Sequence, residues 1–106
     1  MHLFAIDNKD GEEKVVGYCR LLPPGLSYEE ASIGRVLVLK EYRGKKLAKE
    51  MMLKAIQEIH KHFKQEKITI SAQSYIEELY KSVGFKEVSN EYDEAGIPHI
   101  KMKYGI

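Results

Sequence analysis

The segment YRGKKLAKEMM, residues 42–52, places four basic side chains at the expected start of an amphipathic helix: Arg43, Lys45, Lys46 and Lys49. A helix N-terminus has unpaired N–H groups and a partial positive charge, so it favours carboxylates and hydroxyl caps by roughly 0.3–1 kcal/mol per charge. No Ser, Thr, Asp or Asn provides such a cap within this segment. Basic residues become favourable there when a phosphate group binds, because the N–H groups and the cations then share one anion. The segment therefore indicates either an anion site or a solvated basic helix start.

This basic segment follows an apolar strand, which is the position where open α/β sheets bind ligands. Gly44 would let the backbone approach an anion closely, because glycine has no Cβ. The P-loop pattern Gly-x-x-x-x-Gly-Lys-Ser/Thr and the dinucleotide pattern Gly-x-Gly-x-x-Gly are both absent from the sequence. Their absence excludes the usual P-loop nucleotidase and Rossmann interpretations.

The first part of the chain predicts a β-hairpin followed by a further strand. Residues 3–6 and 15–22 are rich in β-forming residues, and the turn dipeptide formed by Asp10 and Gly11 lies between them. Residues 36–39 form the continuous apolar run Val-Leu-Val-Leu, which is typical of a strand covered on both faces.

The clearest periodicity in the sequence predicts a helix over residues 46–64. Residues 67–71, with the sequence KITIS, predict the next strand. A strand–helix–strand unit of this kind normally pairs its two strands in parallel through a right-handed crossover. The apolar residues that form one face of the helix are Leu47, Ala48, Met51, Met52, Ala55, Ile56, Ile59 and Phe63.

The C-terminal part predicts a short second helix and two more strands. The helix begins at Ser74 and stops at Gly84, which suits a left-handed helix stop. Phe85 begins a strand, and a turn-rich segment, residues 89–98, separates it from the alternating final strand HIKMKY. The chain, residues 1–106, thus predicts a single α/β (α+β) domain. Its central sheet is mixed but mostly antiparallel, with about six strands, a parallel pair joined by a crossover helix, and a second short helix.

The sequence RGKKLA, residues 43–48, resembles the loop Gln/Arg-x-x-Gly-x-Gly/Ala of the GNAT acetyltransferase superfamily, whose amides hold the pyrophosphate of acetyl-CoA. The first and last positions match, but Lys46 replaces the middle glycine and loses its freedom of φ. The resemblance implies that the strand before the loop also contacts the acetyl or pantetheine part. The cofactor-binding residues it implies here are Leu37, Val38, Arg43, Gly44, Lys45, Lys46, Leu47 and Ala48.

A second match is QSYIEELYKSVGF, residues 73–85, which is similar to the family's Asn-x-x-Ala-x-x-Leu-Tyr-x-x-x-Gly-Phe. The resemblance implies that Tyr80 binds CoA and protonates the departing thiolate, and that Gln73 stands where asparagine usually contacts pantetheine. A phenol is a suitable donor if it lies within about 3 Å of the sulfur. The alternative is that Tyr80 is a packing residue, because it lies on the apolar face of its helix.

Finer details resemble the ElaA-like subfamily over nearly the whole chain: GYCRLLPPG, IGRVLV, ISAQSY and DEAGIPHIKM have counterparts there. The last segment places His99 at the start of the final strand, as a general base, an acceptor contact or a polar residue that fixes the strand. Many family members carry a carboxylate on the fourth strand, where this sequence offers Arg35. The acidic residues Glu91, Asp93 and Glu94 could attract a cationic amine or form a solvated loop. No general base is identified from these residues.

The resemblance implies an acetyl-CoA-dependent N-acetyltransferase in which a primary amine of a small molecule or peptide attacks the thioester directly. The alternative is a non-catalytic CoA-binding or interaction module that has lost its acceptor pocket. His60 and His62 lie two residues apart on a helix and do not share a face, so no metal site is expected.

The net charge of +1 gives no global attraction to nucleic acid or membrane, and no partner of either kind is expected. The single cysteine, Cys19, excludes an internal disulfide framework and fits a reducing cytoplasm. No apolar run approaches the roughly 20 residues that span a bilayer.

GNAT domains usually begin with a strand and two helices, whereas this chain starts at what resembles their second strand. The first strand's edge would then be exposed, which leads us to expect a homodimer.

Overall fold

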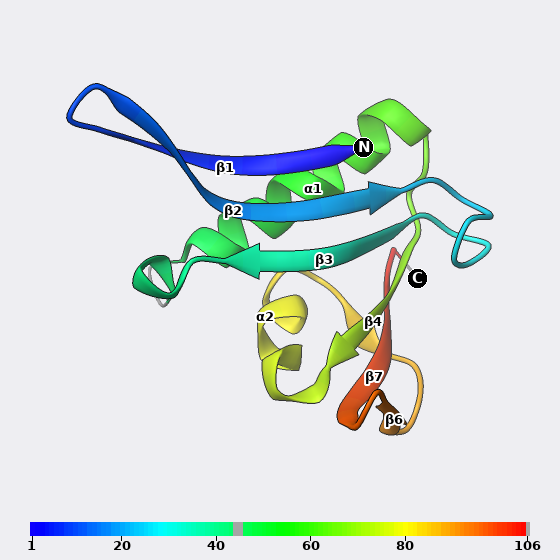
Figure 1. Ribbon diagram of the computed structural model, residues 1–106. Helices are drawn as coiled ribbons and strands as arrows, with labels where there is room; N and C mark the ends of the chain where they lie inside the picture. Colours follow the sequence, from blue (N-terminus) through cyan, green and yellow to red (C-terminus); the bar gives the residue numbers. More distant parts are fainter. Residues whose placement is uncertain (44–45, 106) are drawn as a thin grey trace.

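The computed structural model describes residues 1–43 and 46–105. Among these residues, helices cover one face of an antiparallel sheet and fill the angle between it and a second antiparallel sheet (Figure 1). The element order is β1 (His2–Lys9), β2 (Glu12–Leu22), β3 (Ser32–Val38), η1 (Lys40–Tyr42), α1 (Leu47–Phe63), β4 (Ile68–Gln73), η2 (Ser74–Ile76), α2 (Glu77–Ser82), β5 (Lys86–Glu87), β6 (Tyr92–Glu94) and β7 (Ile97–Tyr104).

The first sheet has the order β1-β2-β3, with antiparallel neighbours. The hairpin between β1 and β2 is confirmed, and its turn residues Asp10 and Gly11 have φ of 54° and 79°. Positive φ at both central residues is the geometry of the two-residue turn that fits strand twist. β2 also passes close to α1, because a Cβ added at Gly17 would lie 3.2 Å from the sulfur of Met51.

The second sheet is built around β7, which pairs with β4, β5 and β6. The strand β6 lies inside the segment that the sequence predicts as turns only. Two of its three residues, Asp93 and Glu94, are disfavoured in strands, and the turn at Ala95 and Gly96, with φ of 54° and 80°, brings β6 onto β7. The pairing therefore follows from the turn and not from the propensity of β6.

The two sheets meet at one point and then separate. A parallel bridge joins Ala31 to Ile68, and the N–H of Thr69 donates to the carbonyl of Ala31 at 2.9 Å. Beyond this bridge β4 turns away from β3 (Figure 1). The predicted parallel direction of these two strands is thus correct. The pairing is shorter than predicted, because in the described residues β3 and β4 form no ladder beyond this bridge.

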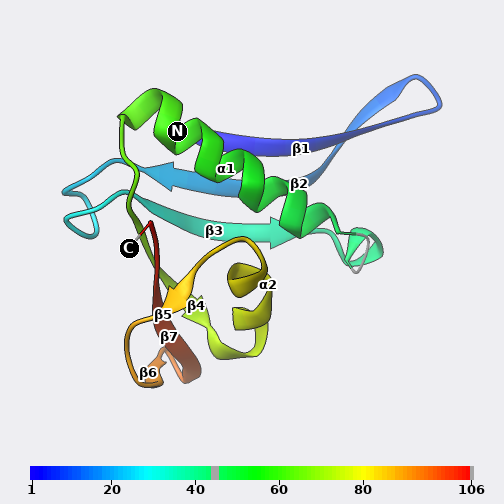
Figure 2. The ribbon, with the colours of Figure 1, turned by 180° about the vertical axis from the view of Figure 1, so that it is seen from behind.

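The helix predicted over residues 46–64 is confirmed as α1, which crosses one face of the first sheet (Figure 2). Its ends are residues with positive φ, Lys46 and Lys64. The second helix is shorter than predicted, because its first turn is the 3₁₀ segment η2. Gly84 has a φ of 108°, as expected of a residue that ends a helix. The buried residues of α1 are Met51, Met52, Ala55, Ile56 and Ile59.

The expectation that the strand at residues 36–39 is covered on both faces is wrong. Val36 and Val38 pack against the core under α1, whereas the side chain of Leu37 is 63% exposed. The opposite face of the first sheet carries a cross-strand row of Phe4, Tyr18 and Leu37, over which no described element packs. The apolar run thus serves a half-buried antiparallel strand, with an apolar outer face.

None of the helices in the described residues is long and apolar enough to span a membrane.

Candidate active site

A cavity of about 370 Å³ opens where β3 and β4 separate. It is bounded by β3 on one side, by β4, β6 and β7 on the other, and by η2 and α2 at one end. Because β3 and β4 share no ladder there, their facing edges are accessible to a ligand. The polar and aromatic residues that line it are Arg35, Ser71, Gln73, Tyr75, Tyr80, Glu94 and His99.

A second cavity, of about 340 Å³, lies at the start of α1. Val38 and Leu79 form part of its wall, and their chain neighbours Leu37 and Tyr80 line the first cavity. The two cavities are therefore lined by neighbouring residues at the end of β3 and on α2. The other residues that line the second cavity are Arg43, Lys46, Ala48, Lys49 and Ser82.

Among the described residues, no side chain caps the start of the helix α1. Lys46, its N-cap residue, adopts the left-handed conformation, with φ 63° and ψ 7°. It thus takes the backbone conformation that glycine adopts most easily, at a cost of roughly 1 kcal/mol. The N–H of Glu50 donates to the carbonyl of Lys46 at 3.1 Å, so the amides of Leu47 and Ala48 precede the helical ladder and have no intrahelical acceptor. This arrangement suits an anion.

The end of β3 is fixed by a side chain from the basic segment. The Nε–H of Arg43 donates to the carbonyl of Val38 at 3.1 Å, so this carbonyl is already engaged. Leu37 lies beside it and faces the edge of the first cavity. Gly44 and Lys45, which the sequence assigns to the same anion site, lie outside the described residues.

Tyr80 lies on α2 where both the core and the first cavity contact it. Its residue is 5% exposed, and its ring packs edge-on against Phe85 at 5.8 Å between centroids. Burial, with smaller contributions from Cys19 and Tyr75, raises the pKa of Tyr80 to about 12. Among the described residues its hydroxyl has no hydrogen-bond partner. The phenol is therefore protonated at neutral pH and free to donate.

His99 is buried at the opposite wall of the cavity, 8% exposed, and opposite Gln73 of β4 in the β-ladder. Its Nδ1 lies 2.8 Å from the carbonyl oxygen of Ile97, which can only accept, so Nδ1 carries the proton of the bond. Its Nε2 lies 3.2 Å from Oε2 of Glu94. In the neutral imidazole Nε2 is thus the nitrogen that can accept a proton.

Comparisons with known proteins decide the family. Residues 1–106 match the family model described as an acetyltransferase (GNAT) domain. The chain belongs to the GNAT acetyltransferase family. Within this family it is ElaA-like: it is 34% identical to protein ElaA of Escherichia coli over 85% of this chain and 59% of ElaA. It is 35% identical to the UPF0039 protein sll0451 of Synechocystis over 99% of this chain and 66% of that protein.

Solved structures agree with the family assignment. The crystal structure of E. coli ElaA matches with a TM-score of 0.77 at 33% identity, over 91% of this chain and 63% of ElaA. An acyl-CoA N-acyltransferase of Pseudomonas aeruginosa matches with a TM-score of 0.81 at 33% identity, over 97% of this chain and 66% of that chain. This GNAT chain therefore spans less than two thirds of the length of these relatives.

Members of the GNAT family use acetyl-CoA as acyl donor, and the described residues fit such a molecule. The uncapped start of α1 and the cations of Arg43, Lys46 and Lys49 suit its phosphates. The adjoining cavity between β3 and β4 suits its long pantetheine arm. Of the described residues that the sequence assigns to CoA, all but one line these two cavities. The exception is Leu47, which lines a different cavity between β1 and α1.

Sequence reasoning did not find the pairing of His99 with Glu94. The hairpin register places Tyr92 opposite His99 and Glu94 opposite Ile97, so Glu94 is a diagonal neighbour of the imidazole. Tyr92 also stacks on the imidazole at 6.3 Å between centroids. The available signal was the glycine at position 96, which permits a two-residue turn between these residues. The position of Arg35 on the cavity wall was not predicted either.

Proposed function

We propose that this protein is an acetyl-CoA-dependent N-acetyltransferase that transfers an acetyl group to a primary amine. The observation that carries the proposal is that two cavities are lined by neighbouring residues at the end of β3 and on α2. One cavity has the cations and the first amides of α1, which suit a diphosphate, and the other is lined by a buried phenol and a buried imidazole. A site of this shape can hold the thioester between a proton donor and a proton acceptor.

The start of α1 binds the negatively charged end of acetyl-CoA in this proposal, and β3 directs the uncharged arm toward Tyr80. Lys46 and Lys49 neutralise the phosphates, while Arg43 also holds the end of β3 through the Val38 carbonyl. Gln73 lies on the opposite wall of the cavity that takes the arm. Most of the catalytic effect then comes from positioning, because a fixed thioester raises the local concentration of reacting groups.

In the chemical step the acceptor first loses a proton from its ammonium group to Nε2 of His99. Its nitrogen then forms a bond to the acetyl carbonyl carbon, and the carbon–sulfur bond breaks. The sulfur takes the hydroxyl proton of Tyr80 as it leaves. The nitrogen loses its second proton to solvent as the amide forms, and solvent then returns one proton to Tyr80 and takes one from His99, so the protons balance. The high pKa of Tyr80 makes it a weak acid in water, but burial of the departing thiolate raises its basicity in the same cavity.

The test has two measurements. Calorimetry with CoA and with acetyl-CoA should show binding that weakens at high salt, as expected of a site that holds phosphates through cations. A thiol-release assay with a panel of amino acids, polyamines, amino sugars and peptides should then identify accepted amines. Binding of CoA without thiol release for any amine would favour the non-catalytic module, and no binding at low salt would exclude both functions.

We also propose that two copies of the chain associate. β1 is an edge strand that pairs only with β2 in the described residues, and the side chains of Phe4 and Ile6 are 53% and 52% exposed. The outer face of the first sheet continues this apolar surface through Tyr18 and Leu37. A second copy would cover both the unpaired backbone groups and the apolar side chains.

A further inference from the structure

The cavity between β3 and β4 carries opposite charges on its two walls. Arg35 lines it from β3, and Glu94 lines it from β6. Glu94 is held by the imidazole of His99, through the 3.2 Å contact between Oε2 and Nε2. Arg35, by contrast, has no hydrogen-bond or ion-pair partner in the part of the chain that the structure describes. The cavity therefore contains a partnered anion and an unpartnered cation.

The position of Arg35 results from an irregularity in β3. Tyr18 pairs with Leu37, but Arg20 pairs with Gly34, so an additional residue of β3 lies between the two pairs. Arg35 adopts a φ of 50° at this bulge. The left-handed conformation costs free energy in any residue with a Cβ. Bulges change the direction of a side chain, and here the displaced residue is one that lines the cavity.

The coenzyme does not account for this guanidinium. Three cations, Arg43, Lys46 and Lys49, already line the cavity at the start of α1, where the phosphates are proposed to bind. The pantetheine arm and the acetyl group that would lie beside β3 carry no charge. Arg35 and Glu94 are therefore both left for the second substrate, the amine.

A simple alkylamine does not match this cavity. Its ammonium group is attracted by Glu94 and repelled by Arg35, so part of the electrostatic attraction is lost. A molecule that carries a carboxylate near its ammonium group satisfies both walls, because the guanidinium binds a carboxylate through two parallel hydrogen bonds. Opposite charges on opposite walls also fix which end of such a molecule lies beside His99.

We propose that the acceptor is an amino acid or another small zwitterion whose carboxylate binds Arg35 and whose amino group lies beside both Glu94 and Nε2 of His99, where it replaces their direct contact. This inference rests on the proposed N-acetyltransferase function. Glu94 acts as a positioning residue: it attracts the ammonium group and stabilises the imidazolium that forms when His99 takes the proton. Arg35 determines specificity and takes no part in bond making.

The test compares amines that differ only in the carboxylate. Thiol release is measured with acetyl-CoA and each amino acid beside its decarboxylated amine, such as alanine with ethylamine. The wild-type kcat/KM should be roughly 10- to 100-fold higher for the amino acid, as expected for a hydrogen-bonded charged group. In Arg35→Gln this preference should disappear, because the kcat/KM for alanine should fall. The kcat/KM for ethylamine should not fall, since Arg35 no longer repels its ammonium group. Arg35→Lys should retain part of the preference.

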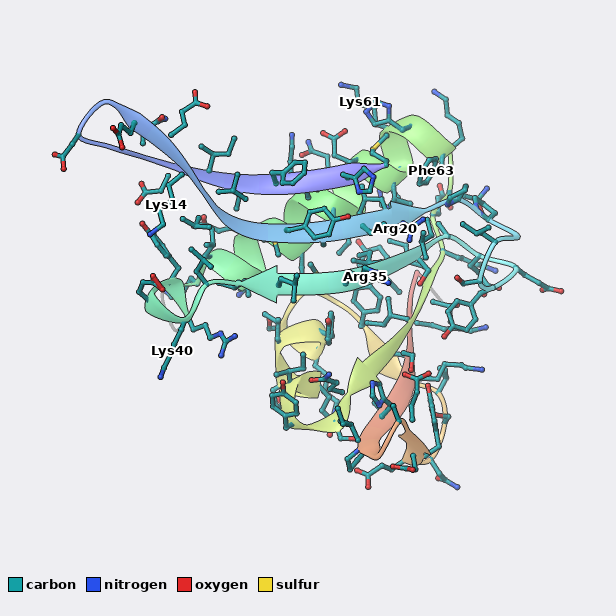
Figure 3. The ribbon with its side chains drawn as sticks, in the orientation of Figure 1. Lys14, Arg20, Arg35, Lys40, Lys61 and Phe63 are labelled. Carbon is teal, nitrogen blue, oxygen red and sulfur yellow. The ribbon has the colours of Figure 1, made fainter. Side chains whose placement is uncertain are left out.

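Arg20→Gln is the matched control. Arg20 is an exposed arginine on the neighbouring strand β2, where it pairs with Gly34, the residue before Arg35 (Figure 3). It does not line the cavity. This variant should keep the wild-type ratio for the two acceptors. Thermal unfolding of all variants shows whether they fold. Equal rates for the two acceptors in the wild type, or equal losses for both in Arg35→Gln, would overturn the inference.

A binding measurement separates this inference from the proposed function. N-acetylalanine and N-ethylacetamide differ only in the carboxylate and resemble the two products. NMR titration in the presence of CoA should show tighter binding of N-acetylalanine to the wild type than to Arg35→Gln. If this difference is found without thiol release from any amine, the transferase function fails and the carboxylate site stands. If transfer occurs and this difference is absent, the carboxylate site fails alone.

Discussion

Tyr80 combines two properties that are usually separate, because its ring packs in the core and its hydroxyl has no hydrogen-bond partner in the described residues. Tyr80→Phe therefore removes a donor and leaves the packing against Phe85 unchanged. We expect kcat to fall about 10²-fold, within the usual range for a general acid. The affinity for CoA by calorimetry should stay within about twofold, since the phosphates bind elsewhere. Unchanged turnover would show that another group protonates the sulfur.

The burial of Cys19 makes the stability of the fold depend on pH. Burial raises the pKa of its thiol to about 11, from an ordinary value of about 8.5. The folded state thus holds this proton more tightly than the unfolded state. Its contribution to stability is complete below about pH 8.5 and is lost as the pH rises through about 11.

The resulting prediction concerns the alkaline limb of unfolding. As the pH rises from about 8.5 to 11, the free energy of unfolding of the wild type, measured by urea titration, should decrease. In Cys19→Ala this decrease should be smaller by about 1–3 kcal/mol. The variant should be less stable at pH 7, because it leaves a small void among residues that are fully buried. Tyr80, whose folded pKa is about 12, accounts for the remaining loss at higher pH. Identical pH slopes in both proteins would contradict the assignment.

At the scale of elements, a basic residue in the first turn of α1 can favour ligand binding and disfavour helix stability at the same time. Lys49 lies in its first turn and lines the basic cavity. Lys49→Glu should raise the free energy of unfolding by about 0.3–1 kcal/mol, because a carboxylate matches the helix dipole there. The same variant should weaken CoA binding about tenfold or more, because it places an anion beside the phosphates. A gain in stability together with a loss of affinity indicates a residue retained for a ligand.

Lys61→Glu is the matched control for this experiment, because Lys61 is exposed in the last turn of the same helix (Figure 3). It should lower the free energy of unfolding by a similar amount, since an anion is unfavourable at a helix C-terminus. The affinity for CoA should not change. Chemical denaturation and calorimetry measure both quantities for both variants. Equal losses of affinity at the two positions would indicate that only net charge matters.

The elements differ in how well the sequence predicts them, for reasons that depend on distance along the chain. α1 was predicted almost to its ends because its apolar period lies within the helix itself. The separation of β3 from β4 was not predicted, because the residues of a strand do not themselves indicate which of its edges remains unpaired. The same limit applies to the site: Tyr80 and His99 were identified by resemblance, whereas the neighbours Glu94 and Arg35 depend on a hairpin register and a bulge.

At the scale of the whole molecule, the apolar outer face and the free edge of β1 point to the same contact. Ile6 lies on this edge strand, opposite Val15, and both side chains are about half exposed. A second copy that adds its own edge strand would pair the free backbone groups and cover these residues. Sedimentation velocity at tens of micromolar should therefore detect a dimer that dissociates on dilution.

Ile6→Lys should convert the dimer to monomer, because a lysine on an edge strand must lose its water when a second strand pairs there. Its thermal midpoint at high dilution should stay close to that of the wild type, since Ile6 is exposed in the monomer. Leu26→Lys is the control: Leu26 is 64% exposed in the loop between β2 and β3, away from the edge of β1. Leu26→Lys should sediment like the wild type. A wild-type protein that remains monomeric at tens of micromolar, or equal effects of both lysines, would show that β1 does not mediate self-association.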